Sequence, residues 1–160
     1  MTDQKMPDTL DEDDTDLPRE EMDQLTFDQI DQLGDAGNDL LDDGAYEAAA
    51  AKFETAFALV PQPFQDWEVS IWLLASLGES YFLMDDFAKA REAFSKALEC
   101  PDAEDSPPIL LRMGQCEYEL GNKDAAAERL MDAYMGEGRE LFADEDEKYY
   151  DYLNSVYELK

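Results

Sequence analysis

The chain has 160 residues and a formal net charge of −29, from 41 acidic and 12 basic residues. Such a charge repels nucleic acid and anionic membrane surfaces and attracts basic partners, so we expect a protein partner, no nucleic acid and no membrane. The sequence contains no histidine, which excludes Ser-His-Asp and Cys-His catalytic arrangements.

The first 22 residues predict a disordered acidic leader (1–22). The segment has few apolar residues, two prolines and the acidic run Asp11–Asp14, so it cannot bury enough surface to offset the entropy of ordering. The run also lacks the glycine and the terminal glutamate of a calcium loop. Because no signal segment and no membrane-spanning run is visible, we expect a cytoplasmic protein. The leader either keeps the chain soluble or contacts a basic partner.

A first helix hairpin is predicted over about 30–63. Small and apolar residues recur at helical spacing in two segments, with Gly37 in the first and Phe53 in the second. Gly44 lies between the segments, where a turn is needed, and Pro61 closes the pattern.

A second hairpin, over about 71–104, follows the same order. Two amphipathic helices, Ile71–Met84 and Phe87–Glu99, are separated by a short polar break. The small residues Gly78, Ala90 and Ala97 fall where the two helices would cross, because small side chains there let the backbones approach. The large residues Tyr81 and Phe94 fill the space beside them. The ten residues before this hairpin are an insertion that we interpret as a longer loop or as an extension of its first helix to near Asp66.

A weaker third copy covers about 107–140, and the segment after it predicts a capping helix over 145–158. Gly114 and Leu130 repeat the small and large positions of the earlier hairpins. Apolar residues at helical spacing form a stripe in the last segment, which we expect to pack against the third hairpin: Tyr149, Tyr152, Leu153, Val156 and Tyr157.

This order of small and large residues resembles the tetratricopeptide repeat (TPR), a helix-turn-helix unit of about 34 residues. The resemblance covers about Ile30–Glu140, although the intervals between the three glycines exceed that period. We therefore predict an all-α fold: a TPR domain over 23–160 whose three hairpins form a short right-handed solenoid with a C-terminal capping helix.

Catalysis and cofactors are not expected. The two cysteines lie in different hairpins without the CxxC spacing of a metal or redox site, so we expect two reduced thiols. No glycine-rich phosphate loop is present. Adjacent carboxylates such as Asp42 and Asp43 fall at predicted hairpin turns, where acids are common. We expect a binding protein without a cofactor or metal, and a monomer or weak dimer when free.

The TPR resemblance implies that the first helix of each hairpin lines a concave groove. Residues of these helices that packing does not require are the candidate partner-binding residues. They are Asp31, Asp35, Asn38, Leu41 and Asp42 from the first repeat, Trp72, Ser76, Glu79 and Phe82 from the second, and Arg112, Gln115, Tyr118 and Glu119 from the third. An acidic groove with aromatic anchors fits a basic, partly apolar partner. The groove holds one cation, Arg112, which disfavours the TPR variant that grips acidic peptide C-termini.

Trp67 lies in the insertion and has two interpretations. It packs the loop onto the hairpins, or it is an interface hot spot, because tryptophan is enriched at such positions. We include it among the candidate partner-binding residues.

Three stretches of the sequence resemble small bacterial TPR immunity proteins of polymorphic toxins, of the Rhs, contact-dependent and type VI kinds. They are residues 44–82, 111–122 and 126–153. The resemblance implies a protein that binds and neutralises a toxin domain. Two alternatives remain: a type III secretion translocator chaperone, which would bind an extended segment, and a general TPR assembly adaptor.

Overall fold

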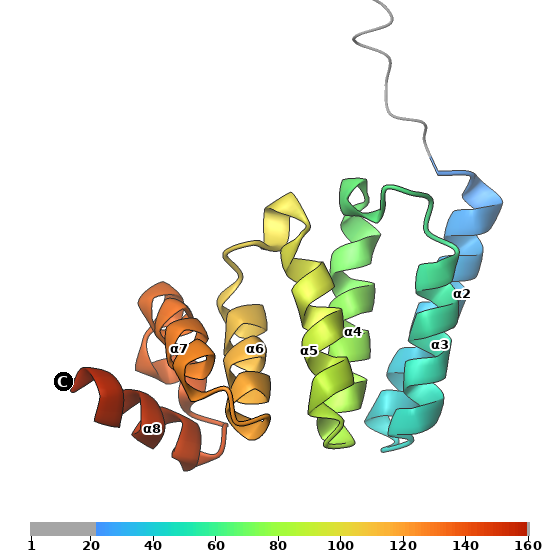
Figure 1. The fold of residues 1–160 in the computed structure, drawn as a ribbon. Helices are drawn as coiled ribbons and strands as arrows, with labels where there is room; N and C mark the ends of the chain where they lie inside the picture. The colour runs from blue at the N-terminus through green and yellow to red at the C-terminus, as the bar shows by residue number, and fades with distance from the viewer. Residues whose placement is uncertain (1–21, 160) are drawn as a thin grey trace, which may run out of the picture.

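Three helix hairpins and a final helix make up the computed structural model, which describes residues 22–159. The hairpins are α2 (Gln24–Asp42) with α3 (Tyr46–Ala58), α4 (Glu68–Leu83) with α5 (Phe87–Leu98), and α6 (Pro107–Glu119) with α7 (Lys123–Glu137), and α8 (Glu147–Tyr157) follows. Figure 1 shows the helices side by side in chain order, from α2 and α3 at one end to α8 at the other. The predicted all-α solenoid is confirmed.

Each hairpin closes around a glycine that faces a large side chain. A β-carbon on Gly37 would lie 2.7 Å from the Phe53 ring, and one on Gly78 would lie 2.7 Å from the Phe94 ring. In the third hairpin, a β-carbon on Gly114 would lie 2.7 Å from the Leu130 side chain. Because any side chain at these glycines would push the helices apart, the pattern read from the sequence sets how the hairpins pack.

The connection between the first two hairpins contains both a loop and an extension of the next helix, the two alternatives that the sequence left open. Phe64–Asp66 forms one turn of 3₁₀ helix, and α4 then begins at Glu68. The buried Ser70 hydroxyl donates a 2.8 Å hydrogen bond to the Phe64 carbonyl, which fastens this turn to α4. The insertion is therefore a short ordered loop followed by a helix that starts before Ile71.

The first helix begins earlier than the predicted repeat. Asp23 caps α2, since its side chain accepts a hydrogen bond from the Thr26 amide, and the helix starts at Gln24. Met22, the last residue of the predicted leader, is partly buried and packs against the core. The rest of that leader, residues 1–21, lies outside the described residues.

The last helix covers the end of the third hairpin. Tyr149 and Leu153 of α8 are buried in one cluster with Leu130 of α7 and with Phe142 of the 3₁₀ helix Arg139–Phe142. The predicted stripe is only partly packed, because Val156 and Tyr157 are 46% and 42% exposed. The stripe continues past the edge of the third hairpin, so the last turn of α8 has no described surface to pack against.

Candidate functional site

The candidate site is the inner face, which we define as the side of α2, α4 and α6 that points away from their hairpin partners, together with the start of α8. Side-chain contacts link α4 to α6 and α6 to the residues around the start of α8, so these elements lie next to one another on this face. The inner face has two halves that differ in how their charges are paired.

The C-terminal half is joined by the Arg112 network, which consists of Arg112, Glu79, Gln115, Glu145 and Phe82. The Arg112 guanidinium donates two 2.8 Å hydrogen bonds to the Glu79 carboxylate, one of 2.6 Å to Glu145 and one of 2.8 Å to the Gln115 side-chain oxygen. Gln115 in turn donates to Glu145 at 2.7 Å. The Arg112 Cζ atom also lies 4.4 Å from the centre of the Phe82 ring, a cation–π contact.

Burial alone would lower the pKa of Arg112, but Glu79 and Glu145 outweigh this effect, so the pKa is raised and the guanidinium stays charged. The network joins α4, α6 and the segment before α8. Three predicted partner-binding residues, Glu79, Arg112 and Gln115, therefore bond to the chain itself, and Gln115 has no exposed surface. Gln115 cannot meet a partner in this conformation.

A second set of contacts joins α6 to α8 around Glu119. Its carboxylate accepts a 2.6 Å hydrogen bond from the Tyr149 hydroxyl and lies 2.8 Å from the Lys148 ammonium. Burial would raise the pKa of Glu119, but the hydrogen bonds from Lys148 and Tyr149 together lower it. Tyr118 is also engaged, because its ring packs edge-on against Tyr149, with ring centres 5.4 Å apart.

The N-terminal half carries the α2 stripe, which we define as Asp31, Asp35, Asn38 and Asp42. All four side chains are exposed. Their spacing places them in one row along α2. No other described residue forms a side-chain hydrogen bond or ion pair with them. The predicted site thus divides into a row on α2 that no described side chain pairs with and a self-paired set on α4, α6 and α8.

A pocket lies between α2 and α4 in this half. It has a volume of about 240 Å³ and is lined by Phe27, Asp31, Glu68, Val69 and Trp72, and we call it the α2–α4 pocket. The sequence predicted Trp72 and Asp31 here but missed Phe27 and Glu68, which precede the predicted repeats.

Gly34 explains how Trp72 reaches this position. A β-carbon on Gly34 would lie 2.2 Å from the indole Cη2 atom, so the ring of Trp72 on α4 rests directly on the α2 backbone. The indole is half-buried and packs against the core. Trp72 therefore holds two helices together and lines the pocket with its remaining surface.

Trp67 is separate from this pocket. It lies beside Cys100 and Pro101 at the loop end of the hairpins and is half-buried against the core. Its indole Nε1 atom is buried without a hydrogen-bond partner among the described residues. The packing interpretation of Trp67 agrees with this placement, and its role as a partner contact stays a prediction.

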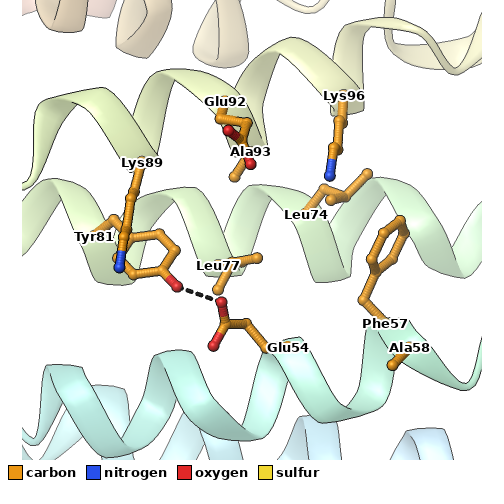
Figure 2. A pocket seen from close by; sticks show the side chains of 10 residues that line it. All are labelled: Glu54, Phe57, Ala58, Leu74, Leu77, Tyr81, Lys89, Glu92, Ala93 and Lys96. Atoms are coloured by element: carbon orange, nitrogen blue, oxygen red, sulfur yellow. Dashed lines mark hydrogen bonds between the residues drawn. The ribbon is translucent and has the colours of Figure 1, made fainter.

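A further pocket on the outer side was not predicted. It has a volume of about 350 Å³ and is lined by residues of α3, α4 and α5, including Leu74, Leu77 and Tyr81. Figure 2 shows the Tyr81 hydroxyl pointing to Glu54, to which it donates a 2.5 Å hydrogen bond. Burial, together with this bond, raises the pKa of Tyr81, so the phenol remains protonated as the donor.

The two cysteines are the thiols of the described part of the chain. Both cysteines are buried and free, and burial raises the pKa of Cys116 to about 12, which suppresses its thiolate. Between residues 22 and 159, no helix is long and apolar enough to cross a membrane.

Solved structures of other proteins share this fold. The Yersinia enterocolitica type III secretion translocator chaperone SycD, in an alternative dimer, matches with a TM-score of 0.62 and 18% identity, covering 84% of this chain and 96% of SycD. The C-terminal TPR-containing domain of a Plasmodium falciparum FK506-binding protein matches with a TM-score of 0.67 and 16% identity. This match covers 87% of this chain and 95% of that domain. Such identities show a TPR-like fold alone. No protein-family model matches the chain, and no curated protein matches it in sequence.

Proposed function

We propose that this protein is a non-enzymatic binding module that recognises a basic protein surface with the N-terminal half of its inner face. The observation that carries the proposal is the α2 stripe beside the α2–α4 pocket. Between residues 22 and 159 no side chain pairs with this stripe, whereas Arg112 in the C-terminal half is already paired. Uncompensated charge next to exposed aromatic surface is typical of a binding surface, because the charge speeds association and the rings supply affinity.

The partner that we propose is a cognate bacterial toxin domain, which the protein neutralises by stoichiometric binding. This step rests on the sequence resemblance to TPR immunity proteins. Many toxin domains with nucleic-acid substrates have basic clefts, and an acidic surface can occupy such a cleft in place of the nucleic acid. In this account the aromatic side chains of Trp72 and Phe27 supply affinity, while the α2 stripe sets the association rate.

The second candidate is a translocator chaperone. The fold likeness to SycD, a type III secretion translocator chaperone, supports it, as does the same inner face, which could hold an extended segment. The two candidates differ in the partner, because an immunity protein binds a folded toxin domain and a chaperone binds an unfolded segment of a secreted protein.

A capture experiment separates the two candidates. The purified protein would serve as bait in a lysate of its native bacterium, and the prey would be identified by mass spectrometry and then co-expressed with it. A toxic domain whose lethality is relieved by co-expression supports immunity. A secreted translocator that becomes soluble on co-expression supports the chaperone. Prey that binds equally well to a variant with Asp31, Asp35 and Asp42 changed to asparagine would overturn the proposed binding surface.

A further inference from the structure

The α2–α4 pocket combines aromatic surface with carboxylates. Phe27, which is 43% exposed, and Trp72 supply aromatic surface, and Asp31 and Glu68 supply two carboxylates. Sites for drug-sized ligands typically enclose about 300–1,000 Å³. At about 240 Å³, this pocket is smaller and suits a single side chain.

A similar combination of an aromatic ring and a carboxylate occurs elsewhere on the inner face, where the chain itself supplies the arginine. There the Arg112 guanidinium lies 4.4 Å from the centre of the Phe82 ring and forms two hydrogen bonds with the Glu79 carboxylate. The cradle between α4 and α6 is thus filled by the chain's own arginine. Within residues 22–159, no lysine or arginine forms an ion pair with Asp31 or Glu68, so the α2–α4 pocket, which lies nearer the start of its helices than the Arg112 contacts do, has no described cation.

We infer that the α2–α4 pocket binds an arginine side chain of the protein partner, between its aromatic rings and its two carboxylates. The inference rests on the proposed function, because it names the group on the partner that this half of the inner face recognises. A planar guanidinium can stack on an aromatic ring and donate paired hydrogen bonds to a carboxylate at the same time, whereas a lysine ammonium cannot.

The pocket wall is preorganised for this contact. The Trp72 ring is held against the backbone at Gly34, so its exposed surface is fixed before a ligand arrives. Glu68 is the first residue of α4, and Asp31 lies in α2, so the two carboxylates reach the pocket from different helices. A rigid site of this kind loses little entropy on binding, which favours affinity for one side chain.

The test titrates the full chain with the blocked peptide acetyl-Gly-Arg-Gly-amide at low salt and follows tryptophan indole resonances by NMR. The resonance of Trp72 is identified as the one absent from W72F. We expect a saturable shift of this resonance with a dissociation constant on the order of 1–10 mM, as suits a single side chain. The peptide with citrulline in place of arginine, which is neutral but similar in shape, should cause no saturable shift, and the lysine peptide should bind several-fold more weakly.

The double variant D31N/E68Q removes both carboxylate charges and keeps the shape of the pocket. It should weaken arginine-peptide binding by about tenfold or more, because each charge-assisted hydrogen bond contributes strongly to a small ligand. The matched variant E128Q/D132N removes two charges from exposed residues of α7, far from the pocket, and should change binding by less than about twofold, since it alters only the net charge. The circular dichroism spectrum establishes that each variant is folded.

Equal binding of the arginine, lysine and citrulline peptides would overturn the inference, as would equal weakening by the two double variants. A shift of the Trp72 resonance in R19Q without any peptide would also overturn it, because the chain's own Arg19 would then be the occupant. A captured partner that binds D31N/E68Q normally but fails to bind the triple α2 variant refutes only the arginine pocket. A partner that binds both variants normally refutes the proposed function itself.

Discussion

The two halves of the inner face use acidic residues in opposite ways. In the C-terminal half, Glu79 and Glu145 pair with Arg112, and Glu119 pairs with Lys148. In the N-terminal half, Asp31 and its neighbours on α2 are exposed and have no partner among the described side chains. The difference teaches that acids lining one groove can have different roles: in one half they pair with cations that join the helices, and in the other half no described side chain pairs with them.

The largest expected effect comes from breaking the paired half. R112A should lower the free energy of unfolding by about 3 kcal/mol, because it leaves Glu79 and Glu145 partly buried without a cation. D35A is the matched control, since Asp35 occupies the equivalent repeat position in α2, and it should change stability by less than about 0.5 kcal/mol. Both are measured by urea unfolding. Equal losses would remove the distinction between the two halves.

A smaller effect should follow from disturbing the pocket wall. G34A places a methyl group where the Trp72 ring lies, and overpacking of this kind costs about 1–3 kcal/mol, offset in part by the better helix propensity of alanine. We expect a net loss of about 1–2 kcal/mol and a red shift of tryptophan fluorescence as the ring moves out. In a W72L background, G34A should have little effect on stability. If G34A lowers stability in the W72L background as much as in the wild type, Trp72 is not the residue that requires the glycine.

Loss of one hydrogen bond in the paired half should cost less. Y149F removes the hydroxyl that donates to Glu119 and should lower the free energy of unfolding by about 1 kcal/mol, as is usual for one hydrogen bond. Y157F, at an exposed tyrosine near the end of α8, serves as the control and should leave stability unchanged. A loss in Y157F as large as in Y149F would mean that the hydrogen bond is not the cause.

The smallest effect is a pH dependence centred on Glu119. Its pKa is below the ordinary value of 4.5 in the folded protein, so its ionised form stabilises the fold. This contribution to stability is complete above about pH 4.5. It is lost as the pH falls through the lower pKa that Glu119 has in the folded protein. The stability difference between wild type and E119Q should therefore be largest near neutral pH and shrink towards pH 3. A difference that does not change with pH would contradict the pairing.

The repeat pattern was readable from the sequence because it depends on local spacing. Gly37, Gly78 and Gly114 each meet a large residue of the next helix, and this pairing recurs at a constant offset that the sequence displays directly. The helices, the hairpins and the capping segment follow from it. The early start of α2 did not, since Gln24 and Leu25 lie outside the repeating pattern.

The division of the inner face was not readable in the same way. Glu145 comes from the segment after the third hairpin, and only the tertiary fold brings it to Arg112 and Gln115. Helical phase placed Gln115 on the groove face, although its side chain is fully buried within the Arg112 network. Phe27 and Glu68 were missed because they belong to extensions of helices beyond the repeats. Contacts between distant segments decide which groove residues remain available.

The most direct test of this account measures the association rate of the captured partner with wild type and with D31N/D35N/D42N. The account predicts that the triple variant associates on the order of tenfold or more slowly, with a flatter salt dependence and an unchanged melting temperature, because the removed charges steer the partner but hold nothing together. An unchanged association rate, or a loss of binding that only accompanies unfolding, would contradict the claim that the N-terminal half of the inner face is the binding surface.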